Sequence, residues 1–237
     1  HGVGGRRAPR GYMLAEQAQD YGRMYGNNPS AWCRDILGVH LISYQDRVIT
    51  SVSQNRQTAW RSGHGVGKSR TAAYCALSFL YTHPMSIVAT TAPTGRQVRN
   101  ILWREIRGMH AQHVKKLGGE VGDPNLTELW LDDQHEWGAF GFSTNDPDQV
   151  QGIHAPYILI VVDEAPGVDL AIMEALVTLA SNKNAHILLI GNPTSLHGPF
   201  YNAFSNPEGW ATIHTSCFDS PNFTGEPCPQ QVLGRVV

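Results

Sequence analysis

The stretch QTAWRSGHGVGKS, residues 57–69, decides the fold. Its first residues suit a β-strand, and the sequence SRTAAYCALSFL that begins at Ser69 suits a helix. Between them lies a match to the phosphate-binding pattern G-x-x-x-x-G-K-[ST], with Ser62 at the first position instead of Gly. Glycines let the backbone N–H groups of such a loop turn toward phosphate, and the helix N-terminus favours negative charge. The stretch therefore predicts a strand, a phosphate-binding loop and a helix.

The pattern gives the residues of this loop separate roles. Lys68 is expected to reach the β- and γ-phosphates of a nucleotide, and Ser69 is expected to hold Mg²⁺. We expect nucleotide contacts throughout the loop and just after it, from Ser62, Gly63, His64, Gly65, Val66, Gly67, Lys68, Ser69 and Arg70.

An apolar run at residues 158–162 ends in Asp163 and Glu164. At the end of a strand, Asp163 can hold the Mg²⁺ shell, directly or through water. Glu164 can orient and deprotonate an attacking water molecule. A strand that ends in Asp-Glu is a weak signal alone, but it becomes strong in the same domain as the phosphate-binding loop. Two adjacent carboxylates favour hydrolysis over phosphoryl transfer to a bound acceptor.

Two further segments, GNPTS and the region of Gln45, are weaker signals for nucleotide contacts. The segment GNPTS at 191–195 follows another apolar run, so Asn192 is expected beside the γ-phosphate, where it could sense phosphate loss. An ordinary Asn-Pro turn is the alternative. Gln45, about twenty residues before the loop, has an amide with a donor and an acceptor, so it can read both polar positions on the adenine edge.

Apolar runs alternate with amphipathic segments from Tyr44 onward, which is typical of an α/β domain. Several runs are almost continuously apolar and end in polar residues, as strands of a doubly covered parallel sheet do. We therefore expect a P-loop NTPase of the RecA/ASCE-like type, with a mostly parallel central sheet flanked by helices. The expected strands lie near 57–61, 86–91, 158–163, 186–191 and 210–215, the expected helices near 12–26, 29–37, 68–82, 95–116, 169–181 and 198–204, and a hairpin at 127–143.

The expected organisation is one large domain with short flanking segments. Residues 1–40 are expected to form an N-terminal arm and short helices, 41–216 the ATPase domain, and 217–237 a linker rich in Pro, Gly and Asn. Because the chain opens with His1 instead of Met, we expect a trimmed start or the remnant of a tag.

The bulk composition narrows the functional classes. With 41% hydrophobic and 16% charged residues, the 237-residue chain has the composition of a globular protein. Its net charge of −2 lacks the basic excess that duplex binding usually requires, so DNA contact must come from a local patch, several copies or a missing part.

Four cysteines without a CxxC pair predict free thiols. No apolar run approaches the ~18 residues of a membrane span, so no membrane association is expected.

These elements, in this order, resemble the N-terminal ATPase domain of the large subunit of tailed-bacteriophage terminases. The resemblance spans about residues 40–225 and depends on Tyr44-Gln45, SGHGVGKS, Thr91-Ala92-Pro93-Thr94 with Gln97, Gln151-Gly152-Ile153-His154, VVDEAPGV and GNPTS. Proteins of this family use ATP to drive DNA into an empty capsid. Their ATPase domain is followed by a metal-dependent nuclease domain with an RNase H-like fold.

The resemblance implies a full set of roles and partners. Gln45 would contact adenine, Lys68 and Ser69 the phosphates and Mg²⁺, and Asp163 the metal. Glu164 would be the catalytic carboxylate, and 192–195 the coupling motif. The implied cofactors are ATP and Mg²⁺. The implied partners are double-stranded DNA, a portal protein, a small terminase subunit and further copies of the chain in a homo-oligomeric ring. The implied location is the host cytoplasm. We expect no nuclease domain in this chain, and hence no nuclease activity.

Two departures from the family pattern leave the source of the transition-state cation undecided. Many relatives carry an Arg inside the phosphate loop, where this chain has His64, and an Arg-Gly pair where it has Gln151-Gly152. The cation that stabilises the transition state could come in cis from Arg61 or Arg70. It could instead come in trans from a neighbouring copy, through Arg96, Arg99 or Arg104 on one expected helix.

Other readings of the nucleotide site are possible. A helicase-like motor is the nearest alternative, but two-lobed helicases need a second RecA-like lobe, for which the chain has little room. A GTP switch would need an Asn-Lys-x-Asp guanine reader, and the sequence at 182–185 lacks the Asp. A small-molecule kinase would need a lid and an acceptor pocket. A non-hydrolysing binding module has no use for Glu164.

Overall fold

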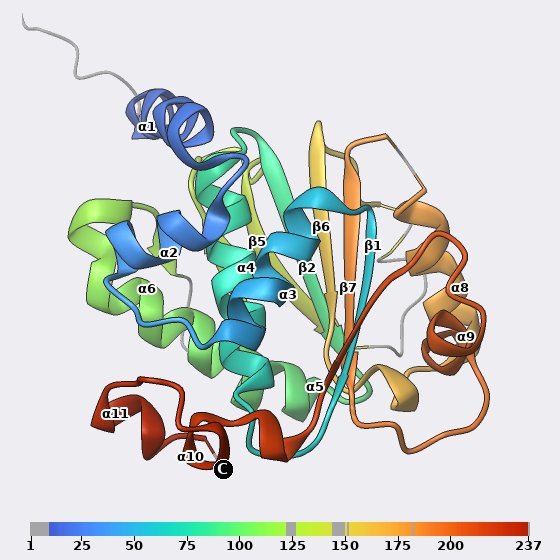
Figure 1. Cartoon of the computed structure of the whole chain (residues 1–237). Helices are drawn as coiled ribbons and strands as arrows, with labels where there is room; N and C mark the ends of the chain where they lie inside the picture. Colours follow the sequence, from blue (N-terminus) through green and yellow to red (C-terminus); the bar gives the residue numbers. More distant parts are fainter. Residues whose placement is uncertain (1–9, 122–126, 144–149, 151, 182, 237) are drawn as a thin grey trace, which may run out of the picture.

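The computed structural model describes residues 10–121, 127–143, 150, 152–181 and 183–236. Its described part contains an eight-stranded sheet in the order β3-β4-β5-β2-β6-β7-β1-β8 (Figure 1). The strands from β5 to β8 in this order are parallel, and β3 and β4 pair antiparallel at one edge. The strands are β1 Gln57–Ser62, β2 Ser86–Ala92, β3 Glu120–Val121, β4 Glu128–Trp130, β5 Gly138–Ser143, β6 Tyr157–Val162, β7 Ala185–Gly191 and β8 Ala211–Thr215. The predicted α/β class and the 127–143 hairpin are confirmed.

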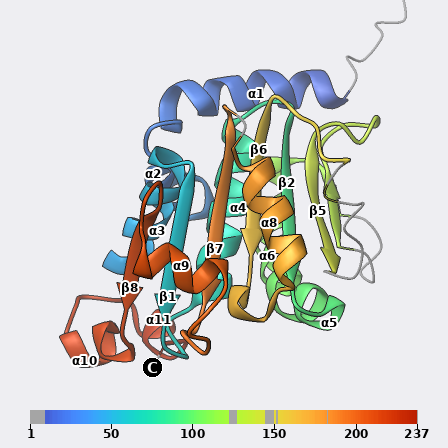
Figure 2. The same ribbon diagram turned by 90° about the vertical axis from the view of Figure 1, so that its right-hand side faces the viewer.

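Helices cover both faces of the sheet, because its central strands are apolar on both sides. In β6, Leu159 and Val161 face one core, while Ile158, Ile160 and Val162 face the other. Figure 2 shows α8 and α9 over the second face. The first face carries α1 Arg10–Tyr25, α2 Pro29–Leu37, α3 Ser43–Gln54, α4 Lys68–Thr82 and α6 Trp103–Leu117; the second carries α8 Leu170–Leu179 and α9 Pro199–Ser205.

The order of the central strands brings the predicted site residues to one edge. β7 lies between β6 and β1 and pairs in parallel with both, with Val162 opposite Leu189 and Arg61 opposite Gly191. The carboxyl ends of parallel neighbours meet at the same edge of a sheet. Asp163, Asn192 and the phosphate loop, which follow β6, β7 and β1, are therefore neighbours despite their separation in sequence.

The helix predicted at 95–116 is present but not uniform. It begins as α5, Gly95–Gln97, passes through the π-helical turn η1, Val98–Leu102, and continues as α6. Trp103 at the start of α6 is fully buried, and its indole N–H donates to the Thr90 hydroxyl at 2.8 Å. Trp103 is therefore part of the core.

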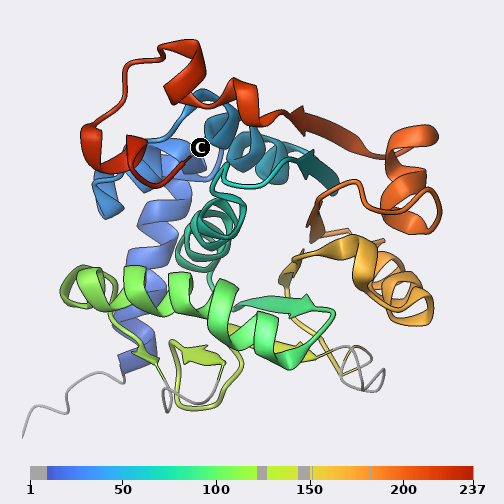
Figure 3. The same cartoon turned by 90° about the horizontal axis from the view of Figure 1, so that it is seen from below.

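Residues 217–236 fold back on the domain. They form η3 Cys217–Asp219, α10 Pro221–Thr224 and α11 Gln230–Leu233. The Glu226 carboxylate accepts hydrogen bonds from the backbone N–H and the hydroxyl of Ser43, both at 2.8 Å. Seen from below in Figure 3, this red segment lies beside the blue helices of the N-terminal third. The expected linker thus makes specific contacts with the start of α3.

Helix α3 and a short 3₁₀ turn lie next to two of the predicted site residues. Helix α3, which the sequence analysis did not predict, carries Gln45 in its first turn. A short 3₁₀ turn, η2 at Ala165–Gly167, follows Glu164. Within the described ranges, no helix combines the length and the apolar character needed to cross a bilayer.

Gly141 in β5 is expected to be required for packing under η1. A Cβ atom there would lie 2.4 Å from Trp103 Nε1 and 2.7 Å from Val98 Cγ1. We predict that Gly141→Ala lowers the free energy of unfolding by about 1–3 kcal/mol. The matched control is Gly108→Ala in α6, where a Cβ meets nothing within 4 Å and helix propensity should add up to about 1 kcal/mol. Urea denaturation of both variants checks this; equal stabilities would contradict it.

Candidate nucleotide-binding site

The phosphate loop takes its shape from two glycines and one buried valine. Gly65 and Gly67 have φ angles of 75° and 77°, a left-handed conformation that costs glycine little. Val66 between them is fully buried in the core on the α4 side and so anchors the loop. At the start of the loop, Gly63 N–H donates to the Thr215 carbonyl of β8 at 3.2 Å. The loop is therefore fixed at both ends, and its backbone leads into the N-terminus of α4.

Lys68, the first residue of α4, is 8% exposed and points back across the loop. Its ammonium donates to the Gly63 carbonyl at 2.8 Å and to Asn192 Oδ1 at 2.7 Å. Burial lowers the pKa of Lys68, and the nearby Glu164 and Asp163 carboxylates oppose that shift. Both acceptors are neutral, so a phosphate oxygen can replace either one with a stronger, charge-assisted hydrogen bond.

Ser69 and Asp163 form a pair of oxygen ligands beside Lys68. The Ser69 hydroxyl donates to Asp163 Oδ2 at 3.2 Å, and Asp163 is only 4% exposed. Burial raises the pKa of Asp163, and Glu164 adds to the rise, so the carboxylate lies where a cation would compensate its charge. A hydroxyl and a buried carboxylate are the hard oxygen donors that Mg²⁺ prefers. These residues therefore fit a magnesium ion.

Glu164 has a strained backbone. Its φ and ψ of 49° and 44° lie in the left-handed region, which is uncommon for residues other than glycine. Its N–H donates to Asp163 Oδ1 at 3.0 Å, and its carbonyl accepts from Gly167 N–H at 3.0 Å. The turn packs tightly on the end of β7, because a Cβ at Gly191 would lie 2.4 Å from Pro166 Cδ. Strain of this kind is concentrated at functional sites.

Asn192 connects Lys68 to the loop residue His64. Its Oδ1 accepts from Lys68, and its side-chain nitrogen lies 2.8 Å from His64 Nε2. Asn192 is 8% exposed, whereas Pro193 and Thr194 are exposed. Of the predicted GNPTS segment, the structure therefore brings Asn192 into hydrogen-bonding contact with the loop.

Gln45 and Arg70 lie at the margins of the loop. Gln45 is 4% exposed; its Oε1 accepts from Ile42 N–H at 3.1 Å, and its Nε2 lies 3.1 Å from where a Cβ of Gly67 would stand. The amide thus adjoins the loop, with its nitrogen toward Gly67. Arg70, one residue past Ser69, forms an ion pair at 3.5 Å with Glu105 of α6.

Two residues of the C-terminal segment lie beside the phosphate loop and were not predicted from the sequence. The Cβ position of Gly63 lies 3.5 Å from Cys217 N, and that of Gly67 lies 3.9 Å from Val236 Cγ1. Neither residue belongs to a pattern with known chemistry, and both are far from the loop in sequence. Only the three-dimensional structure can place them there.

The chain is similar in sequence to known proteins. The model of the AAA domain family matches residues 40–198, more than half of the chain. A probable terminase large subunit of Enterobacteria phage P7 is 27% identical over 181 residues, which are 71% of this chain and 37% of that protein. The chain therefore spans little more than a third of the length of this curated relative.

Solved structures share the fold. The large terminase ATPase domain of Thermus phage P74-26 superimposes with a TM-score of 0.67 at 19% identity, covering 87% of this chain and 96% of that one. The large terminase of a further thermophilic bacteriophage, in complex with ATP-γ-S, has a TM-score of 0.54 at 15% identity, covering 81% and 48%. The P-loop NTPase fold predicted from the sequence is confirmed.

The hydrogen bond from Lys68 to Asn192 is expected to stabilise the protein without nucleotide. Asn192→Ala would leave the buried ammonium with Gly63 as its acceptor, and we predict a loss of about 1–3 kcal/mol in the free energy of unfolding. Denaturation without nucleotide measures it. The matched control, Asn202→Ala at an exposed position of α9, should change stability by less than ~0.5 kcal/mol. Similar losses in both variants would show that the bond has no such role.

Proposed function

The chain belongs to the AAA domain family, and from this premise we propose that it is the ATP-hydrolysing motor domain of a tailed-bacteriophage terminase large subunit. The observation that carries the proposal is the meeting of Lys68, Ser69, Asp163, Glu164 and Asn192 at one sheet edge. A phosphate-binding cation, two oxygen ligands and a second carboxylate are the groups that hydrolysis of a nucleoside triphosphate needs.

Each residue acts on a different part of the bound nucleotide. Lys68 exchanges its bonds to Gly63 and Asn192 for phosphate oxygens, while the N–H groups of the loop surround the phosphates. Ser69 and Asp163 would hold Mg²⁺, which when bound neutralises charge on the β- and γ-phosphates. Glu164 orients the attacking water molecule and accepts its proton.

Gln45 and Asn192 supply recognition and sensing in this proposal. Gln45 contacts the adenine edge once its buried amide is uncovered, with Nε2 as donor and Oε1 as acceptor. Asn192 reports the state of the γ-phosphate, because its Oδ1 is free only while Lys68 binds phosphate. Residues 192–195 would transmit that change to α9, which follows them in the chain.

The work done with this ATP is proposed to be the translocation of double-stranded DNA into a procapsid. The support is the similarity to the phage P7 terminase subunit, together with the terminase folds among the solved structures. These matches favour a packaging motor over a helicase-like one. The proposed partners are DNA, a portal protein, a small terminase subunit and further copies of the chain in a ring, acting in the host cytoplasm.

Binding and turnover should separate in two variants. We predict that Lys68→Ala abolishes ATP binding, because the ground-state phosphate contact is lost. Glu164→Gln should retain binding and lose turnover by about 10²-fold or more, because a general base contributes roughly 10²–10⁴. Nucleotide titration and phosphate release measure the two steps. Lys183→Ala, an exposed lysine before β7, is the control for charge removal. Normal turnover by the Glu164→Gln protein would exclude Glu164 as the base.

The transition-state cation is proposed to come from a neighbouring copy. Both cis candidates have other contacts: Arg70 pairs with Glu105 at 3.5 Å, and the Arg61 guanidinium lies 4.7 Å above the Phe204 ring. The trans candidates Arg96, Arg99 and Arg104 are exposed. A supplied arginine is worth roughly 10³–10⁵ in phosphoryl transfer.

Specific ATPase activity should therefore rise with protein concentration, and one of the variants Arg96→Ala, Arg99→Ala or Arg104→Ala should lose ~10³-fold or more. Mixing that variant with Lys68→Ala protein provides the sharper test. The first protein keeps the nucleotide site and the second keeps the arginine, so activity returns only if the arginine acts in trans. Loss confined to Arg61→Ala or Arg70→Ala, without recovery on mixing, would show a cis cation.

A further inference from the structure

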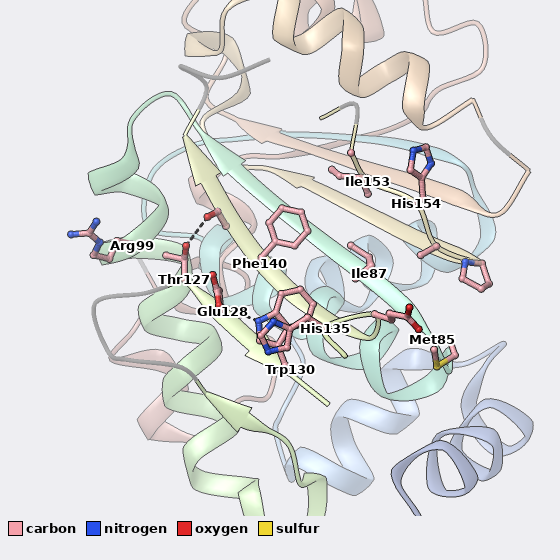
Figure 4. A pocket seen from close by; sticks show the side chains of 15 residues that line it. Met85, Ile87, Arg99, Thr127, Glu128, Trp130, His135, Phe140, Ile153 and His154 are labelled. Carbon is pink, nitrogen blue, oxygen red and sulfur yellow. Dashed lines mark hydrogen bonds between the residues drawn. The ribbon is translucent and has the colours of Figure 1, made fainter. Parts of the chain in front are cut away.

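A large cavity lies away from the nucleotide site, on the face of the sheet that carries α8 and α9. Figure 2 shows these helices on this face, where they contact β7, β1 and η2. The cavity is lined by residues of β2, β4 and β5. The cavity has a volume of about 920 Å³, and its floor includes Ile87, Trp130, Phe140 and Ile153 (Figure 4). We call it the β5 groove.

The β5 groove contains an ordered aromatic platform. The His135 ring stacks on Trp130 with centroids 4.7 Å apart and planes 9° apart, and Phe140 lies 6.3 Å from Trp130. His135 and Met85, both in the lining, have φ angles of 58°. Glu164 is the remaining non-glycine residue with positive φ among the described residues. Strained backbone thus occurs at the nucleotide site and at this groove, as is common at ligand sites.

The polar lining of the groove includes two carboxylates, together with Arg99, Thr127, His135 and His154. Glu128 accepts one hydrogen bond, from Trp130 Nε1 to Oε2 at 3.1 Å, and Glu136 is exposed at the rim. Neither carboxylate forms an ion pair with the described residues. The guanidinium of Arg99 is directed away from the centre of the groove in Figure 4. Two carboxylates therefore line the groove, and neither is paired with a cation among the described residues.

We propose that the β5 groove binds a short segment of a partner protein that carries an apolar or aromatic side chain next to an arginine or lysine. The apolar side chain would pack on Ile87, Phe140 and Ile153, where the area that it buries supplies affinity. The cation would lie beside Glu128 or Glu136 and would gain a charge-assisted hydrogen bond to the carboxylate. Nucleic acid is disfavoured, because its phosphates would face uncompensated carboxylates.

The groove is separate from the nucleotide-site residues, although its lining includes Arg99, one of the three candidates for the cation in trans. Met85 precedes β2, and Ala155 and Pro156 precede β6, so this part of the lining lies at the amino ends of the strands. The nucleotide-site residues follow the carboxyl ends of β1, β6 and β7. A partner in the β5 groove can therefore be bound while nucleotide occupies its own site.

The test is an unbiased selection against the whole chain. Random dodecapeptides displayed on yeast are sorted for binding to the native protein alone, and the retained peptides are then measured on the Glu128→Gln, Glu136→Gln double variant. We expect the retained peptides to combine Arg or Lys with Trp, Phe or Leu. Their synthetic forms should bind the double variant at least about tenfold more weakly and should shift the Trp130 indole N–H signal in NMR spectra.

Two single variants serve as controls for the effect of the double variant on peptide binding. Glu208→Gln, an exposed carboxylate in the turn before β8, should leave peptide binding within about twofold. Glu136→Gln alone, at an exposed position, should weaken binding without changing the urea midpoint. Enrichment of acidic peptides, retained peptides that bind the double variant equally well, or tighter binding of oligothymidylate at the Trp130 signal would each overturn the proposal.

Discussion

The structure of the site depends on the burial of one positive charge. Lys68 is a buried residue, and burying an unpaired charge in a protein costs several kcal/mol. It is held by the Gly63 carbonyl from its own loop and by Asn192 from a different strand. That arrangement is possible because β7 lies between β1 and β6, so the end of β7 reaches across the loop. This position of Lys68 depends on the sheet order and on the glycines of the loop. The strained turn at Glu164 lies at the same edge of the sheet.

Much of this architecture could be predicted because its signals are local. The Gly-rich loop between a strand and a helix, and apolar runs that end in polar residues, identify their elements within a few residues. The strands near 57–61, 86–91, 158–163 and 186–191 and the helix near 68–82 were predicted in this way. The sequence also indicated that Lys68, Ser69, Asp163 and Asn192 would meet, since the ends of parallel strands share an edge.

What could not be predicted depends on contacts between distant residues. Nothing in SYQDRVITSVSQ shows that α3 is completed by the carboxylate of Glu226, 183 residues later. The π-helical turn at Val98–Leu102 departs from the regular period expected for 95–116, and η1 there packs against β5. Left-handed backbone at Met85 and Glu164 is likewise imposed by packing, because Met and Glu do not favour it.

The pairing of β1 also has a consequence for protein synthesis. Its two hydrogen-bonded neighbours, β7 and β8, begin at Ala185 and Ala211, more than a hundred residues after β1 ends. A ribosome adds residues at roughly 5–20 per second, so the loop sequence leaves the exit tunnel many seconds before the strands that fix it. Until then, β1 has no partner and Lys68 has no Asn192. The nascent chain therefore cannot form the nucleotide site until almost the whole domain has been translated.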